Sequence, residues 1–376
     1  MWKFTPELEM LRDTVRKMAN EVIAPRAAEI DLTGEFPWDI KELLQRQGIL
    51  SLPFPEGGCE QKHTAVCLAV EEIARVCVSS SLILQVQALG ATPILLAGTE
   101  AQKTKYCPPL ASGEKLCAFG LTEPDAGSDA AAMATTAELR GDTYILNGLK
   151  HFISNATVAD VFCIFAMTDR SKGTKGITAF IVEKDYPGFH IGRVEKKMGI
   201  RGSPTAEIVF EDCRVPRENL LGKEGDGFKI AMKTLDYSRP VIAAQAVGVA
   251  QAGLDFAVKY SKERIQFGVP IAQLQGIQFM LADMAAQTEA ARALTYHAAA
   301  LADEDSPQLS YIAAAAKLMA SDVAMRVTTD AIQVAGGYGY MVDFPAERYM
   351  RDAKITQIYE GTNQIQRLVI ARQLLR

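Results

Sequence analysis

The hydrophobic positions of the first third of the chain recur at helical spacing. One apolar stripe consists of Leu8, Leu11, Val15, Met18 and Val22, and a richer one covers 65–84. Thr5 and Pro6 are suited to the N-cap and first position of the opening helix. The turn-rich run 53–58 interrupts this pattern. We therefore predict helices from Thr5 to about Leu116.

Between about 118 and 226 the apolar spacing changes to two, as expected for strands. Short apolar runs cover 143–146, 150–154, 161–166, 177–182 and 208–210, and Gly, Pro and Lys separate them. Asn147-Gly148 is a strong short-range signal for a tight turn. It predicts a hairpin between the first two of these runs.

Alanine-rich helical sequence returns from Phe228 and covers 230–264, 275–303 and 309–335. This order of helices, strands and helices predicts an α+β fold that is mostly α. It disfavours an alternating nucleotide-binding fold. We expect a helical domain over 1–117, a β-domain over 118–226 and a C-terminal four-helix bundle over 227–376.

A final helix is predicted at the C-terminal end. Asn363 can N-cap it, and Gln366 can reach back as in a capping box. The face expected to dock carries Ile365, Leu368, Val369 and Leu375.

The composition of the chain excludes several classes of protein. Its 376 residues carry 45 acids and 40 bases, and a net charge of -5 gives no global field that attracts nucleic acid. No apolar run approaches a membrane span, and Met1–Thr5 leads into the first helix without a signal or transit segment, so a cytoplasmic location is expected. Seven cysteines without a CxxC pair and four histidines without metal-ligand spacing predict reduced thiols and no metal site.

Glu360 is a candidate general base. It stands at an element boundary among apolar residues, and Gly361 leaves room for a ligand beside the backbone. The alternative is that Glu360 only complements the dipole of the following helix. These residues alone leave both roles open.

Three further segments offer chemistry without defining it. The run 119–129 supplies hydroxyls and exposed N–H groups that suit a pyrophosphate or polar heterocycle, but also a turn between domains. The glycines of 333–340 match no phosphate-loop spacing and fit a helix C-cap. Arg264 to Gly268 places a guanidinium near an aromatic ring at a helix end.

Taken together, these segments resemble the acyl-CoA dehydrogenase family of flavoenzymes over nearly the whole chain. The motifs that carry the resemblance are FGLTEPDAGSD (119–129), NGLKHFISNA (147–156), MGIRGSPTAEIVFEDCRVP (198–216), TLDYSRPVIAAQAVGVAQ (234–251), ERIQFG (263–268), LADMA (281–285), QVAGGYGY (333–340) and YMRDAKITQIYEGTNQIQR (349–367). The short- and medium-chain members are the most similar.

The resemblance implies FAD between the β-domain and the bundle, a homotetramer, and electron transfer to electron-transfer flavoprotein. The FAD contacts that it implies are Phe119, Leu121, Thr122, Ser128, Phe152, Ile153, Ser154, Thr362 and Gln364, and from a neighbouring subunit Arg264, Gln266, Phe267, Gln275, Gln333, Gly336 and Gly337. Ser128, Asp236, Ser238, Arg239 and Gly361 would contact the acyl-CoA. Glu360 matches the family's catalytic base, and its N–H would help to polarise the thioester carbonyl. Ser238 stands where long-chain and isovaleryl-type members place their base, so Glu360 has no obvious rival.

The expected function is therefore α,β-dehydrogenation of a short- to medium-chain acyl-CoA, whether straight, branched or cyclic, to a trans-2-enoyl-CoA. An acyl-CoA oxidase or enoyl-CoA reductase built on the same site is the alternative, and a non-catalytic assembly protein is the third hypothesis. The floor of the acyl pocket is expected around 85–90 and Leu235.

Overall fold

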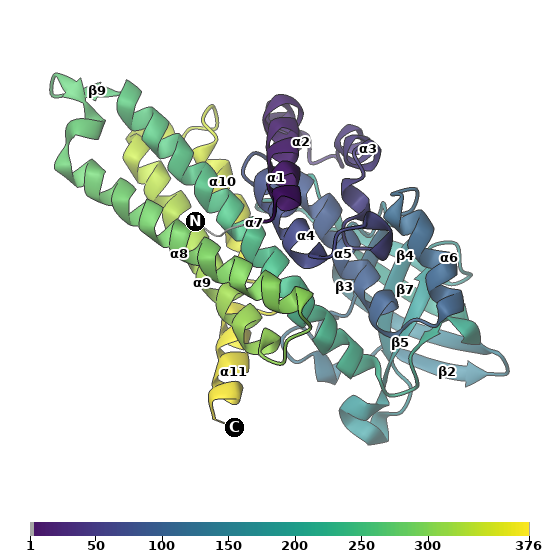
Figure 1. Ribbon diagram of the computed structural model, residues 1–376. Helices are drawn as coiled ribbons and strands as arrows, with labels where there is room; N and C mark the ends of the chain where they lie inside the picture. Colours follow the sequence, from purple (N-terminus) through teal and green to yellow (C-terminus); the bar gives the residue numbers. More distant parts are fainter. Residues whose placement is uncertain (1–3, 376) are drawn as a thin grey trace.

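The computed structural model describes residues 4–375. The predictions for the two ends of the chain include residues 1–3 and 376, which lie outside the described residues. Figure 1 shows a long helical bundle on one side, a β-sheet on the other, and the N-terminal helices packed where the two meet.

The N-terminal third is helical, as predicted. Its helices are α1 (Pro6–Met18), α2 (Ala27–Thr33), α3 (Trp38–Arg46), α4 (Lys62–Ala74), α5 (Val78–Ala97) and α6 (Glu100–Ala111). The Thr5 side chain accepts a hydrogen bond from the Leu8 N–H, so the predicted N-cap is confirmed. Val22 falls outside the predicted stripe because α1 gives way to a wider turn after Met18, and Val22 is exposed.

The middle segment forms one mixed sheet. Its strands are β1 (Cys117–Gly120), β2 (Thr136–Arg140), β3 (Thr143–Ser154), β4 (Val161–Met167), β5 (Ile177–Glu183), β6 (Phe189–Val194), β7 (Thr205–Pro216) and β8 (Leu220–Leu221). The order is β6-β7-β3-β2-β4-β5-β8, and β1 pairs with β4 in parallel. Strands β4 and β5 are buried along almost their whole length, which explains their continuous apolar runs.

The predicted hairpin turn at Asn147-Gly148 is wrong. These two residues lie inside β3, where the register against β7 shifts, and the Asn147 side chain bonds Asp212 on β7. Gly148 is required there because a Cβ would stand 2.5 Å from the Thr135 hydroxyl oxygen. The tight turn is Gly141-Asp142, which joins β2 to β3, and Gly141 has a φ of +64° that glycine adopts readily.

The C-terminal part is a helical bundle, as predicted. Its elements are α7 (Gly227–Glu263), the small hairpin β9 (Ile265–Gln266) and β10 (Val269–Pro270), α8 (Gln275–Asp303), α9 (Leu309–Ala335), α10 (Ala346–Thr356) and α11 (Asn363–Leu374). The α+β fold class with mostly helical content is thus confirmed. The three domain ranges stay a prediction, which the changes of secondary structure near 117 and 226 support.

The prediction for the last helix is partly wrong. Thr362, and not Asn363, is the N-cap, because its side chain accepts from the Ile365 N–H. The buried residues of α11 are the polar Asn363 and Gln366, whereas Leu368 and Leu375 are exposed. The helix is therefore attached through its first turn, and its later turns project from the body (Figure 1).

Within residues 4–375, two helices are long and apolar enough to cross a membrane by length and composition, contrary to the expectation from the sequence. They are α5 and α7, and 72% of the apolar window of each is buried inside the protein. Burial of that extent is typical of the core helices of a soluble protein.

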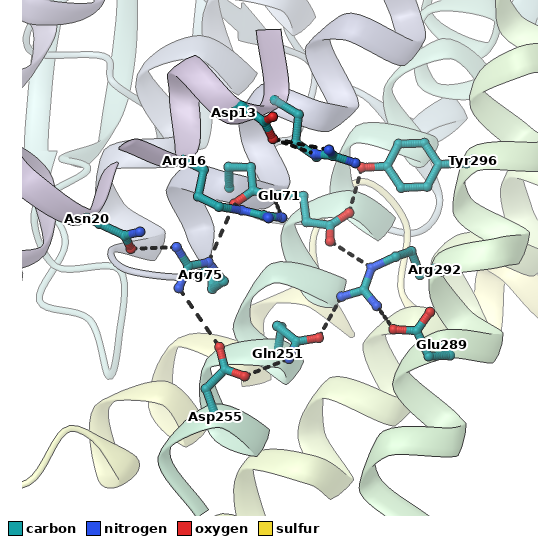
Figure 2. A network of polar contacts seen from close by, with 12 residues as sticks. Asp13, Arg16, Asn20, Glu71, Arg75, Gln251, Asp255, Glu289, Arg292 and Tyr296 are labelled. Carbon is teal, nitrogen blue, oxygen red and sulfur yellow. Dashed lines mark hydrogen bonds and ion pairs between the residues drawn. The ribbon is translucent and has the colours of Figure 1, made fainter. Parts of the chain in front are cut away.

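A polar network docks the N-terminal helices against the bundle (Figure 2). Glu71 on α4 accepts hydrogen bonds from Arg292 (2.8 Å) and Tyr296 (2.6 Å) on α8. The neighbouring Glu72 is paired with Arg16 on α1 at 2.6 Å. Because buried charges must be paired, these contacts fix α1 and α4 relative to α8.

Candidate active site

Glu360 lies in a sharp bend between α10 and α11. Glu360 has a φ of +51° and Gly361 a φ of +92°, and a non-glycine residue in this region is strained. A Cβ at Gly361 would stand 2.8 Å from the Gln366 side-chain nitrogen. The bend therefore needs glycine after the glutamate, and it turns the carboxylate away from α11.

Two buried side chains hold the carbonyl groups of this bend. Lys317 on α9 donates from Nζ to the Gly361 carbonyl oxygen at 2.8 Å. Gln366 on α11 donates to the same oxygen at 2.8 Å and to the Glu360 carbonyl oxygen at 3.3 Å. Gln366 does reach back, as the sequence predicted, but to these carbonyl groups and not to the N-cap N–H.

The Glu360 carboxylate faces α7. It accepts a short hydrogen bond from the Ser238 hydroxyl. Burial raises the pKa of Glu360, while the Ser238 hydrogen bond and the charges of Lys317 and Arg239 act in the opposite direction. The Glu360 N–H donates no hydrogen bond to the described part of the chain, so it is free to donate to a ligand.

Arg239 lies one residue beyond Ser238 and is buried. Its Nη1 donates to the Asp236 carboxylate at 2.6 Å, but its Nε has no hydrogen-bond partner among residues 4–375. A buried guanidinium nitrogen without a partner is costly unless a ligand satisfies it. Asp236, Ser238, Arg239, Glu360 and Gly361 are thus brought together as predicted.

A cavity of about 280 Å³ adjoins this cluster between α4, α5 and α7. Its apolar lining includes Val66, Ala88, Leu89, Leu96 and Val241, and Ser238 and Gln85 lie at its border. The Gln85 side-chain oxygen is buried and has no hydrogen-bond partner in the described part of the chain, while its nitrogen donates to the Tyr359 hydroxyl at 3.3 Å.

The expectation for the pocket floor is only partly met. Gln85, Ala88 and Leu89 line the cavity, whereas Leu235 is buried in the core between α7 and the sheet and does not line it.

A second group of predicted residues gathers at one end of the sheet. The His151 N–H donates to the Thr122 carbonyl oxygen at 2.8 Å, which places 119–129 beside the end of β3. The buried Lys150 ammonium reinforces this contact because it lies 2.7 Å from Glu123 and 3.2 Å from the Leu121 carbonyl oxygen.

Sequence reasoning did not identify the Lys150–Glu123 pair, although both residues lie in the quoted motifs. Burial alone would raise the pKa of Glu123, but Lys150 outweighs it and the pKa is lowered. Burial lowers the pKa of Lys150 to about 8, against the effect of Glu123. The pair would have been found only by knowing that these two segments are adjacent.

Phe152 is directed outward by a bulge in β3. The register against β7 shifts between Lys150 and Ile153, and Phe152 has a φ of +58°. Its ring is 60% exposed and stacks on His151 with 3.8 Å between ring centroids. Bulges of this kind re-aim a side chain, often beside a functional site.

The other predicted cofactor residues of this group differ in burial. Ile153 and Leu121 are buried, and Phe119 packs against Phe165. Ile153, Leu121 and Phe119 therefore support, from the protein interior, the surface that this group of residues forms. The hydroxyls of Thr122 and Ser154 are half-buried and donate no hydrogen bond to the described residues. Ser128 is exposed. Thr362 is the half-buried N-cap of α11, and Gln364 beside it is exposed.

A third group lies far from the sheet, at the opposite end of the bundle (Figure 1). The β9–β10 hairpin carries Arg264, Gln266 and Phe267, and the Arg264 guanidinium lies 5.3 Å from the Tyr338 ring centre. Gln275, Gln333, Gly336 and Gly337 are exposed, and nothing lies within 4 Å of where a Cβ of either glycine would be. One chain therefore does not bring this group to Thr122 and Ser154.

The chemistry of these residues fits a flavin nucleotide. The exposed Phe152 ring and the hydroxyls of Thr122 and Ser154 suit a flat heterocycle with polar edges, and the open glycines suit a phosphate chain. Because they lie on two separated ends of one chain, they fit one FAD only if a second chain supplies the distant group.

Three side chains could also hold a cation, although the sequence predicted no metal site. His151, Glu195 and Glu207 place ligand atoms within 4.8 Å of one another and are partly buried. Arg193 already pairs with Glu195 at 2.7 Å, so we interpret the cluster as a group of ion pairs beside the bulge in β3.

Comparison with known proteins gives matches over the whole chain. Three family models match in series, described as the N-terminal, middle and C-terminal domains of acyl-CoA dehydrogenase, over residues 5–114, 118–213 and 225–375. The short-chain specific acyl-CoA dehydrogenase of Clostridium acetobutylicum is 51% identical, and the match covers 100% of both chains. The acryloyl-CoA reductase (NADH) of Anaerotignum propionicum is 50% identical over 100% of this chain and 96% of that protein. The solved structure of butyryl-CoA dehydrogenase from Megasphaera elsdenii is 49% identical, covers 100% of both chains and has a TM-score of 0.96.

Proposed function

Because this chain belongs to the acyl-CoA dehydrogenase family of FAD-dependent oxidoreductases, we propose that it dehydrogenates a short- to medium-chain acyl-CoA with Glu360 as the base. The observation that carries the proposal is the buried carboxylate of Glu360 close to a cavity that is partly lined by apolar side chains. The resemblance in the sequence to this family is confirmed by the matches.

Glu360 is suited to remove the proton α to a thioester. That proton is weakly acidic, so the base must be poorly solvated and the carbonyl must be polarised. Burial raises the pKa of Glu360, which makes its carboxylate a stronger base. The N–H of Glu360, which donates to no group among residues 4–375, would donate to the thioester carbonyl, as the resemblance implies.

FAD, when bound, accepts the hydride from the β-carbon. Thr122 and Ser154 would hold the flavin through their hydroxyls, and Phe152 would cover its edge. Arg264, Gln266, Phe267, Gln275 and the Gln333–Gly337 loop of a neighbouring subunit would hold the adenine and pyrophosphate.

Arg239 and Asp236 would hold the acyl-CoA near its thioester. The free Nε of Arg239 offers a charged donor, and Asp236 fixes the guanidinium at the other side. Ser238, on the same turn of α7 as this pair, donates to the Glu360 carboxylate, so this turn would contact both the substrate and the base.

The cavity supports a short or medium acyl chain. Its volume is about 280 Å³. Apolar side chains of α4, α5 and α7 contribute to its lining, together with the charged Lys62, Lys233, Asp303 and Asp305. A branched or cyclic chain of similar volume also fits this description.

Three further features belong to the same proposal. Electron-transfer flavoprotein is the expected acceptor, as the resemblance implies. A homotetramer is expected, as the resemblance implies, and the separation of the cofactor residues of one chain supports association with at least one further chain. A cytoplasmic location is also part of the proposal, and it agrees with the burial of the two long apolar helices inside the protein.

Enoyl-CoA reduction is the second candidate function. It is favoured by the 50% identity to acryloyl-CoA reductase, since reduction uses the same site in the opposite direction. Glu360 would then return a proton to the α-carbon instead of removing one.

Anaerobic mixing of the purified FAD-containing protein with acyl-CoA tests the proposal. Butyryl-, octanoyl- and cyclohexanecarbonyl-CoA should bleach the flavin absorbance rapidly, whereas palmitoyl-CoA should do so slowly. Rapid reoxidation by electron-transfer flavoprotein and slow reoxidation by oxygen should follow. Absence of bleaching with every acyl-CoA would refute dehydrogenation, and faster reoxidation of the reduced flavin by an enoyl-CoA than by the flavoprotein would favour the reductase.

A further inference from the structure

Lys317 on α9 is a completely buried lysine. No carboxylate among residues 4–375 lies within ion-pair distance of its ammonium group. Burial of a charge without a directly bonded carboxylate disfavours folding. The position therefore invites a functional explanation.

All the hydrogen bonds of the Lys317 ammonium go to the segment after Glu360. It donates to the Gly361 carbonyl oxygen at 2.8 Å and to the Asn363 side-chain oxygen at 3.0 Å. Asn363 is itself held by Ser321 at 2.9 Å and by Asp322 at 2.7 Å. Lys317 thus joins the bend to α9 through contacts that are buried or partly buried.

The bend needs this support because its backbone is strained. Glu360 and Gly361 both have positive φ values, of +51° and +92°. Strained backbone persists only where the surroundings hold it. Without Lys317, the Gly361 carbonyl would keep Gln366 as its one side-chain donor within the described residues.

We infer that Lys317 is a positioning residue for the proposed reaction: its ammonium fixes the bend that carries Glu360 and places a positive charge behind the carboxylate. The inference rests on the proposed role of Glu360 as the base. It assigns to α9 a part in proton abstraction, although Lys317 is not placed in contact with the substrate.

The charges around Glu360 agree with this role. Those that face it are Asp236 and Arg239 on α7, Lys317 and Asp322 on α9, and the Tyr359 hydroxyl of its own segment, while α5 contributes the neutral Gln85. Arg239 is paired with Asp236 at 2.6 Å, whereas Lys317 has no carboxylate within ion-pair distance among residues 4–375. The charges of both cations favour the ionised form of Glu360.

The ionisation of the two groups is mutually supportive. Burial lowers the pKa of Lys317 to about 7, and the charge of Glu360 opposes that change. In the same way the charge of Lys317 opposes the effect of burial on the pKa of Glu360. Loss of Lys317 should therefore shift the ionisation of Glu360 to higher pH.

The test compares Lys317→Met, Lys317→Arg and the control Thr328→Val in the FAD-containing protein. Thr328 is equally buried on the same helix and bonds only backbone of α9, so its variant reports on helix packing. For Lys317→Met we expect unchanged FAD content and thermal stability, KM within about twofold, and kcat reduced roughly 10- to 100-fold. The acidic limb of the kcat–pH profile should move up by about one pH unit.

In Lys317→Arg, which keeps the charge, the midpoint of the acidic limb of the kcat–pH profile should lie within a few tenths of a pH unit of the wild-type midpoint. Thr328→Val should not shift this midpoint. The inference is overturned if Lys317→Met has the wild-type kcat and pH limb, or if Thr328→Val shifts the limb equally. If Lys317→Met does not fold, Lys317→Gln keeps an amide donor without charge, and an unmoved limb in that variant overturns the inference. Failure of the wild-type protein to bleach with any acyl-CoA would instead refute the proposed function, so the two failures are distinguishable.

Discussion

At the scale of single residues, the environment of Glu360 decides between two interpretations of a carboxylate next to a helix. A glutamate that only complemented the dipole of α11 would point at the free N–H groups of its first turn. Glu360 instead points to Ser238 on α7, and the first turn is capped by Thr362. Burial raises the pKa of Glu360, whereas a dipole partner would have a lowered pKa. The structure therefore favours the catalytic interpretation.

Arg239→Ala should reduce kcat/KM for acyl-CoA by roughly 100-fold, because a charged donor near the thioester is lost and Asp236 is left unpaired. The FAD content should differ from the wild-type value by no more than about a tenth, since Arg239 is not among the expected flavin contacts. Steady-state kinetics and the flavin-to-protein absorbance ratio measure both. Arg239→Lys is the matched control, and unchanged kinetic constants in Arg239→Ala would remove Arg239 from the site.

At the scale of elements, the helices were predicted more reliably than their connections. The predicted ranges 275–303 and 309–335 agree with the bounds of α8 and α9, because the period of a long apolar pattern can be recognised from the local sequence alone. The Asn147-Gly148 turn was wrong because the partner strand β7 and the nearby Thr135 override a local preference. The signal at Gly141-Asp142 was present in the sequence and was missed.

The candidate site shows the same division. Glu360, Thr122 and Arg239 could be identified from motifs that are short and contiguous. Lys317 and the Lys150–Glu123 pair could not, because each lysine acts on a segment distant in sequence. A lysine in an alanine-rich helix looks like an exposed residue until its burial is known.

Asp352 on α10 should make the stability of the wild-type protein depend on pH. It is buried, and it accepts a hydrogen bond from the Ile200 N–H at 2.6 Å, which ties α10 to the segment before β7. Burial raises the pKa of Asp352 to about 6, whereas an aspartate in an unfolded chain titrates near 3.9. The folded state thus binds this proton more tightly, so its contribution to stability is present below about pH 4 and is lost as the pH rises through 6.

Asp352→Asn should therefore flatten this dependence and keep the acceptor oxygen. Urea unfolding at pH 4.5, 6 and 7.5 would measure it. We expect the variant to gain stability relative to the wild type as the pH rises across this window. A constant difference between the two proteins at all three pH values would contradict the assignment.

At the scale of the whole molecule, the expected cofactor residues divide between the sheet and the far end of the bundle (Figure 1). Thr122 and Ser154 belong to the first group, and Phe267 to the second. If both groups hold one FAD, as proposed, a complete FAD site requires association of chains. The exposed Phe267 ring is explained by this arrangement, since an apolar side chain that is 92% exposed contributes little to the fold of its own chain.

Phe267→Ser should consequently lower FAD occupancy severalfold without reducing the helical content of the protein. Leu32→Ser is a suitable control, because Leu32 on α2 is similarly exposed but lies away from the expected cofactor residues. FAD per chain and the mass in solution by light scattering measure the two effects. Full FAD occupancy in Phe267→Ser would count against a site shared between chains.

The most direct test of the central claim is the reductive half-reaction of Glu360→Gln, which keeps the shape of the side chain and removes its charge. The variant should retain FAD and show the spectral change of acyl-CoA binding, but flavin bleaching by butyryl-CoA under anaerobic stopped-flow conditions should slow by roughly 10³-fold or more. Glu304→Gln, at an exposed acid, should bleach at the wild-type rate. Rapid bleaching of Glu360→Gln would contradict the account, because another group would then remove the proton.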